Sequence, residues 1–135
     1  MNERRRPRRA LLVIATLALI PTGLLVRLLP GAAGDLGGGT LYAMLIAGLL
    51  ACLAPRARPW LIGLTAFAIS AAIELLQLTT VPSTLAQAFP LARFVLGTTF
   101  AVTDLVAYAV GSALAVGCLA VAHRSQPRST ARTRD

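Results

Sequence analysis

The chain has 135 residues, of which 56% are hydrophobic and only 13% are charged, and its mean hydropathy is +0.73. This composition excludes a disordered chain and argues against a soluble globule, because a small globule cannot bury so much apolar surface. The formal charge of +8 comes from arginine alone, with 13 arginines and no lysine. Nine of these arginines lie in the two terminal arms, five in residues 1–9 and four in residues 124–135.

Apolar segments that can cross a lipid bilayer as helices, which takes ~20 residues, follow one another along the chain. There are four, at about residues 10–29, 37–54, 60–78 and 94–122. They are continuously apolar, whereas the strands of a membrane barrel alternate. The sequence predicts an all-α integral membrane bundle of four transmembrane helices over residues 10–122, between a basic arm at 1–9 and a basic, disordered tail at 123–135.

The fourth apolar segment is longer than one straight crossing requires. A helix of its 29 residues would be ~43 Å long, against a hydrocarbon core of ~30 Å. We expect this segment either to tilt or to break near Gly97–Thr103, with its first part lying at the interface or re-entering the membrane.

The positions of the arginines predict the orientation of the bundle. Eleven arginines lie in the two arms and in the loop at residues 54–59, whereas the other side has only Arg27 and Arg93. By the positive-inside rule, both termini are expected in the cytoplasm. A cleavable secretory signal is the alternative for residues 1–23, but no small-x-small cleavage site follows the apolar run. The arms are expected to contact anionic lipid rather than nucleic acid, because they contain no aromatic residue for base stacking.

Motifs for a metal, a cofactor or a catalytic nucleophile are not evident. Cys52 and Cys118 with the single His123 do not make a metal site, and we interpret both cysteines as small packing residues. The glycine-rich run GAAGDLGGG (31–39) lacks the preceding strand of a phosphate-binding loop. We interpret it as a flexible turn before the second span. We therefore expect no metal ligands, no catalytic residues and no cofactor.

Two acidic residues lie inside the predicted spans, where a carboxylate costs ~2.5–3.5 kcal/mol on an insertion scale. Glu74 shares one face of the third span with Ser70 and Gln77, because the spacing is i, i+4, i+7. Asp104 shares a face of the fourth span with Tyr108 and with Gly111 or Ser112. The small residues Ala107, Gly111 and Ala115 on that span are spaced for close helix packing.

These side chains are predicted to gather near the extracytoplasmic ends of the spans. The candidate polar cluster consists of Arg27, Glu74, Gln77, Arg93, Asp104 and Tyr108. Asp35 lies nearby in the chain. One interpretation is a buried network of ion pairs and hydrogen bonds that sets helix register. A second is an outward-facing pocket for a headgroup, a proton or an ion, and a third is separate charges that snorkel to the interface.

An ordered set of motifs resembles a family of small bacterial membrane proteins. The motifs are R-x-L-P-G (27–31), L-Y-A-M (41–44), A-P-R (54–56), S-x-x-I-E-x-x-Q-L (70–78), R-x-x-L-G (93–97) and D-L-x-A-Y-x-x-G (104–111). Over residues 24–115 they resemble domain-of-unknown-function family two-eight-zero-nine, and their pattern is similar to VanZ-like proteins. The family usually has Gly-Asp before the Leu-aromatic-Ala step, whereas this chain has Gly38-Gly39-Thr40, so no family role is carried over to Asp35.

The resemblance implies a multi-pass protein of the bacterial plasma membrane without an assigned activity, and the VanZ-like pattern implies a link to the cell envelope and glycopeptide tolerance. Our preferred hypothesis is a non-enzymatic factor that interacts with membrane lipid or with the headgroup of an envelope precursor. The alternative is a small proton- or ion-coupled transporter, acting as a homo-oligomer. A third hypothesis is a membrane enzyme on a lipid-linked substrate, with Glu74 and Asp104 as acid and base.

Overall fold

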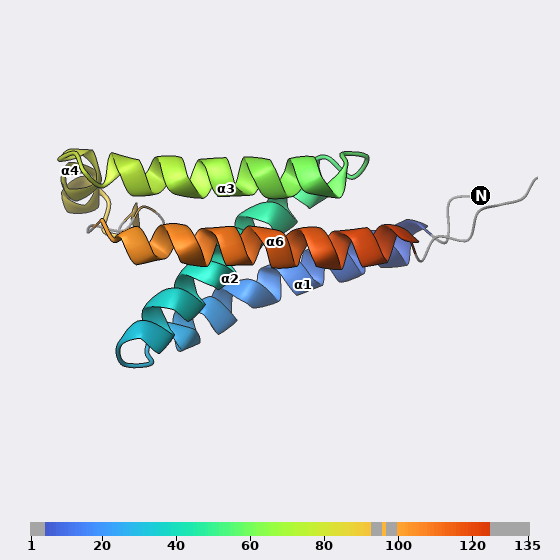
Figure 1. The fold of residues 1–135 in the computed structure, drawn as a ribbon, viewed down its shortest axis with the longest axis horizontal. Helices are drawn as coiled ribbons and strands as arrows, with labels where there is room; N and C mark the ends of the chain where they lie inside the picture. Colours follow the sequence, from blue (N-terminus) through green and yellow to red (C-terminus); the bar gives the residue numbers. More distant parts are fainter. Residues whose placement is uncertain (1–4, 93–95, 97–99, 125–135) are drawn as a thin grey trace, which may run out of the picture.

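The computed structural model describes residues 5–92, 96 and 100–124. The helices of this part are α1 (Arg5–Val26), α2 (Ala32–Leu53), α3 (Pro59–Leu76), the short α4 (Val81–Ala88) and α6 (Val102–Arg124) (Figure 1). Four of them, α1, α2, α3 and α6, are long and apolar enough to cross a membrane. The predicted all-α bundle of four transmembrane helices is therefore confirmed.

Proline and glycine residues mark several helix boundaries. Pro59 begins α3 and Pro82 lies in the first turn of α4. Proline has no amide hydrogen, and at these positions an amide group would have no acceptor within the helix, so no helical hydrogen bond is lost. Between α1 and α2 the chain reverses at Gly31, whose φ of 65° lies in the left-handed region that glycine tolerates. Helix α1 continues through Pro21.

Helix α2 occupies the centre of the bundle, packed against α1, α3 and α6, and α6 also packs against α3. Helices α2 and α6 run parallel to each other, and α1 and α3 run in the opposite direction (Figure 1). One end of the bundle therefore holds the α1–α2 turn, α4 and the beginning of α6; we call it the Glu74 end. The opposite end holds the beginning of α1, the α2–α3 turn and the end of α6.

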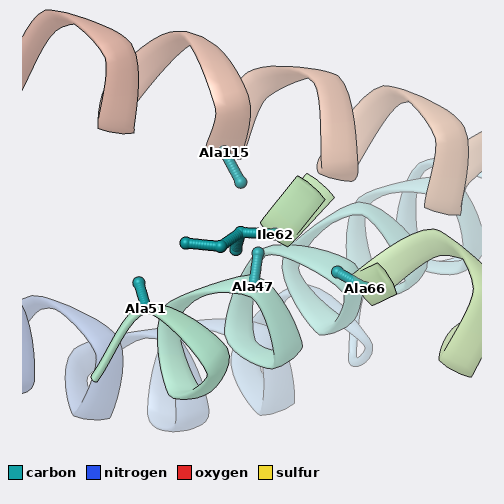
Figure 2. Close-up of a cluster of buried hydrophobic side chains, with 5 residues drawn as sticks. All are labelled: Ala47, Ala51, Ile62, Ala66 and Ala115. Atoms are coloured by element: carbon teal, nitrogen blue, oxygen red, sulfur yellow. The ribbon is translucent and has the colours of Figure 1, made fainter. Parts of the chain in front are cut away.

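Small side chains make up most of the core. The central cluster comes from α2, α3 and α6 and consists of Ala47, Ala51, Ile62, Ala66 and Ala115 (Figure 2). Because lipid tails are as apolar as a leucine side chain, small residues that let helix backbones approach closely take over the role of large core residues.

The expected small-residue face of α6 packs against a matching face of α2. Ala107, Gly111 and Ala115 are all buried. A Cβ atom added at Gly111 would lie 2.2 Å from the backbone oxygen of Thr40, so the two helices are in backbone contact there. The matching residues on α2 recur every fourth position and are all buried: Gly39, Ala43, Ala47 and Ala51.

The interpretation of residues 31–39 as a flexible turn is wrong. Helix α2 begins at Ala32, so all but the first of these residues are helical. Their glycines make room for neighbouring chain segments. A Cβ atom at Gly34 would lie 2.2 Å from the oxygen of Leu29, and one at Gly38 would lie 2.6 Å from Cγ of Arg27.

Helix α6 begins at Val102, within the Gly97–Thr103 segment where a break was expected, and Phe100 and Ala101 precede it in a non-helical conformation. The other residues of that segment, 97–99, lie outside the described residues. Of the predicted tail, Arg124 ends α6 and residues 125–135 likewise lie outside them. Cys52 is half-buried and Cys118 is exposed, so the described bundle packs around the first cysteine and leaves the second at its surface.

Candidate functional site

Glu74, in the last turn of α3, is completely buried, with 0% of its surface exposed. Its Oε2 atom accepts a hydrogen bond of 2.8 Å from the hydroxyl of Tyr108 on α6. Its Oε1 atom accepts one of 2.6 Å from the backbone amide of Ala101. Both carboxylate oxygens are therefore satisfied by the protein, which offsets the cost of placing an acidic group inside an apolar bundle.

Helical periodicity places Glu74 against α6. The buried residues of α3 include a series at every fourth position, which consists of Ile62, Ala66, Ser70 and Glu74. Gln77 ends this face half-buried, and its Nε2 atom donates a hydrogen bond of 2.5 Å to the backbone oxygen of Leu96. The predicted shared face of Ser70, Glu74 and Gln77 thus lies toward α6 and the segment that precedes it.

The bond to Ala101 places Glu74 at the N-terminus of α6. The first amide groups of a helix have no partner within the helix, and the helix dipole favours a negative group there. Glu74 supplies such a group from another helix, and Asp104 supplies a second within the first turn of α6. This end of α6 is therefore held electrostatically as well as by packing.

Tyr42 on α2 adds a second aromatic ring to the site, next to Tyr108. Its ring lies 6.1 Å from the ring of Tyr108, centroid to centroid, with the two planes inclined by 50°. Such tilted geometry is favourable for two aromatic rings. The sequence analysis noted the L-Y-A-M motif but did not assign Tyr42 to the cluster. The spacing of the small residues Gly39 and Ala43, which lie on the buried face of α2, could have indicated that this part of α2 packs against α6.

Three charged residues, Arg27, Asp35 and Asp104, also belong to the Glu74 end. Arg27 is exposed, follows α1 and packs its side chain on Gly38, where a Cβ atom would lie 3.0 Å from its Nε atom. Asp104 is half-buried, and the charges of Arg27, Asp35 and Glu74 all act on it electrostatically. Asp35 itself is exposed in the first turn of α2.

The structure therefore brings together most of the predicted cluster in two parts. Glu74 and Tyr108 form a buried, hydrogen-bonded pair, and Asp104 and Arg27 interact electrostatically at the surface of the same end. Gln77 contacts the chain segment before α6. Arg93 lies outside the described residues.

Three polar atoms near the buried pair lack a hydrogen-bond partner among the described residues: the hydroxyls of Ser70 and Ser112 and Oε1 of Gln77. Within the same residues, no group of three histidine, cysteine, aspartate or glutamate side chains is placed to hold a metal ion. The chemistry open to this arrangement is recognition of charge at the surface, while the hydrogen bond from Tyr108 to Glu74 is buried in the interior.

Comparison with known proteins identifies one family. No curated protein and no solved structure matches the chain. The family described as Protein of unknown function (DUF2809) matches residues 28–112, which include every candidate residue except Arg27. The chain therefore belongs to this family, and its helices are those of a membrane-spanning protein.

Proposed function

We propose that this protein is a non-enzymatic, multi-pass protein of a bacterial plasma membrane that binds a polar headgroup at the Glu74 end of the bundle. The observation that supports the proposal is that exposed Arg27, exposed Asp35 and half-buried Asp104 lie at this end of the bundle, where the charges of Arg27 and Asp35 act on Asp104. A guanidinium binds phosphate through two parallel hydrogen bonds, and the two carboxylates suit an ammonium group. The matching ligand carries both a phosphate and an amine.

Glu74 has a different role in this proposal. Because its two oxygens already accept hydrogen bonds from Tyr108 and Ala101, it positions the beginning of α6 and with it Asp104. The headgroup contacts Arg27, Asp35 and Asp104 at the surface, whereas Glu74 is buried and does not contact it. A loss of headgroup binding in a Glu74 variant would therefore act through α6.

We place the Glu74 end on the extracytoplasmic side and both termini in the cytoplasm. The support is the arginine distribution, because the beginning of α1, the α2–α3 turn with Arg56 and Arg58, and the end of α6 lie together at the opposite end (Figure 1). The ligand then comes from the outer leaflet, either as a membrane phospholipid or as a lipid-linked envelope precursor.

Lipid retention tests the proposal. Native mass spectrometry of the purified protein, taken from membranes of phosphatidylethanolamine and phosphatidylglycerol, should show retained phosphatidylethanolamine. Arg27→Gln and Asp104→Asn should each reduce its retention about tenfold, as expected for the loss of ~1.4 kcal/mol. Arg56→Gln removes one positive charge, as Arg27→Gln does, but at the opposite end of the bundle, and it should leave retention unchanged. Equal retention in all four proteins would disprove the site.

A competition arm separates the two sources of the headgroup. If a polyprenyl diphosphate whose headgroup also carries an amine displaces phosphatidylethanolamine from the wild-type protein and not from Arg27→Gln, the natural ligand is an envelope precursor. If it does not compete, the ligand is the phospholipid.

Proton-coupled transport is the second candidate, and the buried Glu74–Tyr108 pair is the observation that favours it. A carboxylate inside a membrane helix is a frequent site of proton transfer. In liposomes with an imposed pH gradient, a transporter would give proton flux that Glu74→Gln abolishes. Absence of flux from the wild-type protein would rule this candidate out.

A further inference from the structure

Helix α4 carries large apolar side chains that the described part of the protein leaves uncovered. Val81 is 44% exposed and Leu85 is 38% exposed. Phe89, which caps the helix, is 67% exposed, and its amide donates a hydrogen bond to the backbone oxygen of Leu85. The spacing of these three residues is i, i+4, i+8, so their side chains form one apolar stripe along α4.

The remaining faces of α4 differ in character from the apolar stripe. Pro82 is buried and Ala86 is half-buried, so their face lies against the bundle. Ser83, Thr84 and Gln87 are exposed. Because successive residues are ~100° apart around a helix, these polar residues lie on the side away from the stripe. An apolar face and a polar face on one helix are typical of helices that lie in the plane of a membrane interface.

The length of α3 places α4 at the level of a membrane interface. Helix α3 has 18 residues, so it is ~27 Å long against a hydrocarbon core of ~30 Å. Exposed Trp60 lies in its first turn, and tryptophan is enriched at membrane interfaces, so the end of α3 reaches the opposite interface. Residues 77–80 then lead into α4, which is seen nearly end-on in Figure 1. Helix α4 therefore runs across the direction of the long helices, as a helix along the interface does.

Exposed apolar surface continues from the third span into α4. Leu75 is 55% exposed and Leu78 is 64% exposed near the end of α3, and Leu91, after α4, is 77% exposed. Exposed leucines of a membrane-spanning helix face the lipid chains, which are equally apolar. The apolar stripe of α4 follows this lipid-facing surface directly along the chain, so lipid is the partner that its position indicates.

We propose that α4 is inserted in the membrane interface at the Glu74 end, with the side chains of Val81, Leu85 and Phe89 among the lipid chains. The partner is the boundary between headgroups and acyl chains, into which the apolar face of an interfacial helix sinks by ~5–10 Å. Ser83 and Gln87 then face the headgroups and water. Because α4 joins α3 to the segment that precedes α6, its insertion fixes the depth of the Glu74 end in the leaflet. This insertion is independent of the headgroup site proposed above.

Spin labels on two faces of α4 give the first test. In a Cys52→Ala, Cys118→Ala background, Leu85→Cys and Ser83→Cys each carry the label in nanodiscs that hold a single copy of the protein. Oxygen concentrates in the lipid chains and a nickel chelate stays in water, so the ratio of the two accessibilities reports the environment of each label. The ratio should be shifted toward oxygen at Leu85 and toward nickel at Ser83.

Two further positions calibrate this ratio. Ile69→Cys, at an exposed position in the middle of α3, gives the value for lipid, and Arg56→Cys, in the α2–α3 turn, gives the value for water. Equal ratios at Leu85 and Ser83 would overturn the proposal. Low accessibility of the Leu85 label to both reagents would also overturn it, because another part of the same chain would then cover the stripe.

Fluorescence quenching measures the depth of insertion. In a Trp60→Phe background, which removes the single tryptophan of the chain, Leu85→Trp should be quenched more strongly by lipids brominated near the headgroup end of their chains than by lipids brominated near the methyl end. Ile69→Trp, the matched control in α3, should show the reverse order. Absence of quenching at position 85, or the same order as at position 69, would disprove the interfacial position of α4. Neither result would affect the headgroup proposal, which lipid retention tests separately.

Discussion

The hydroxyl of Tyr108 donates a hydrogen bond of 2.8 Å to Oε2 of Glu74, and these two side chains are 3% and 0% exposed. The bond joins α3 to α6 across 34 residues of sequence. A shift of either helix by one residue would turn one partner away from the other by ~100°, since a helix has 3.6 residues per turn. The pair therefore selects one register of the α3–α6 interface.

Removing the hydroxyl of Tyr108 should destabilise the bundle. Tyr108→Phe keeps the ring and its contact with Tyr42 but leaves an oxygen of Glu74 without its donor. We expect a loss of about 1–3 kcal/mol in the free energy of unfolding, measured by reversible denaturation in mixed micelles.

The control for this prediction is the same change in a Glu74→Ala background. There the tyrosine hydroxyl has no acceptor, so Tyr108→Phe should be neutral or stabilising. An equal loss in both backgrounds would show that the hydroxyl acts through some other contact.

A methyl group at Gly111 should push α2 and α6 apart. The Cβ atom would lie 2.2 Å from the backbone oxygen of Thr40 and 3.0 Å from Cβ of Ala43, so a backbone must move. Gly111→Ala is therefore expected to cost about 1–3 kcal/mol. On the same helix, Gly117 is exposed with no atom within 4 Å of an added Cβ, so Gly117→Ala should be neutral or stabilise by up to about 1 kcal/mol. Thermal unfolding of the two variants compares them, and similar melting temperatures would contradict the backbone contact.

The contact between Gly63 and Val116 allows a test by rescue. A Cβ atom at Gly63 would lie 2.2 Å from Cγ2 of Val116, which is the end of a side chain. Gly63→Ala should destabilise the bundle by about 1–3 kcal/mol through overpacking. Val116→Ala removes the obstructing atom, so the double variant should be more stable than Gly63→Ala alone. If the loss of stability in the double variant equals the sum of the two single losses, the contact between Gly63 and Val116 is not the source of the strain.

Cysteine labelling checks the proposed orientation. In a Cys52→Ala, Cys118→Ala background, Ser83→Cys on exposed α4 should react with a membrane-impermeant maleimide in intact cells. Arg56→Cys in the α2–α3 turn should react only after the membrane is permeabilised, because positive charge is retained in the cytoplasm. The reverse pattern would place the Glu74 end in the cytoplasm.

The four spans could be predicted because a membrane crossing depends on local properties, namely the length and the polarity of a segment. Helical spacing likewise predicted that Ser70 and Glu74 share a face, and that Ala107, Gly111 and Ala115 form a close-packing face. These are statements about residues within one helix. The pattern of the family motifs also predicted the family to which the chain belongs.

The same reasoning was wrong about residues 31–39, because the effect of a glycine depends on what lies against it. Read alone, a glycine-rich run indicates a flexible turn. Here Gly34 and Gly38 lie in α2, against Leu29 and Arg27, where a side chain would collide. Helix packing decided this, since it determines whether an absent side chain leaves empty space or admits a neighbour.

The sequence by itself determined that the chain forms apolar helices and that Glu74 must avoid lipid. Only the tertiary structure decided that Tyr108 and the amide of Ala101 are its partners, and that Tyr42 lies against Tyr108. A hydrogen bond requires two atoms within about 3 Å of each other. Separations of this size depend on the register between helices, which arises from the packing of all of them together.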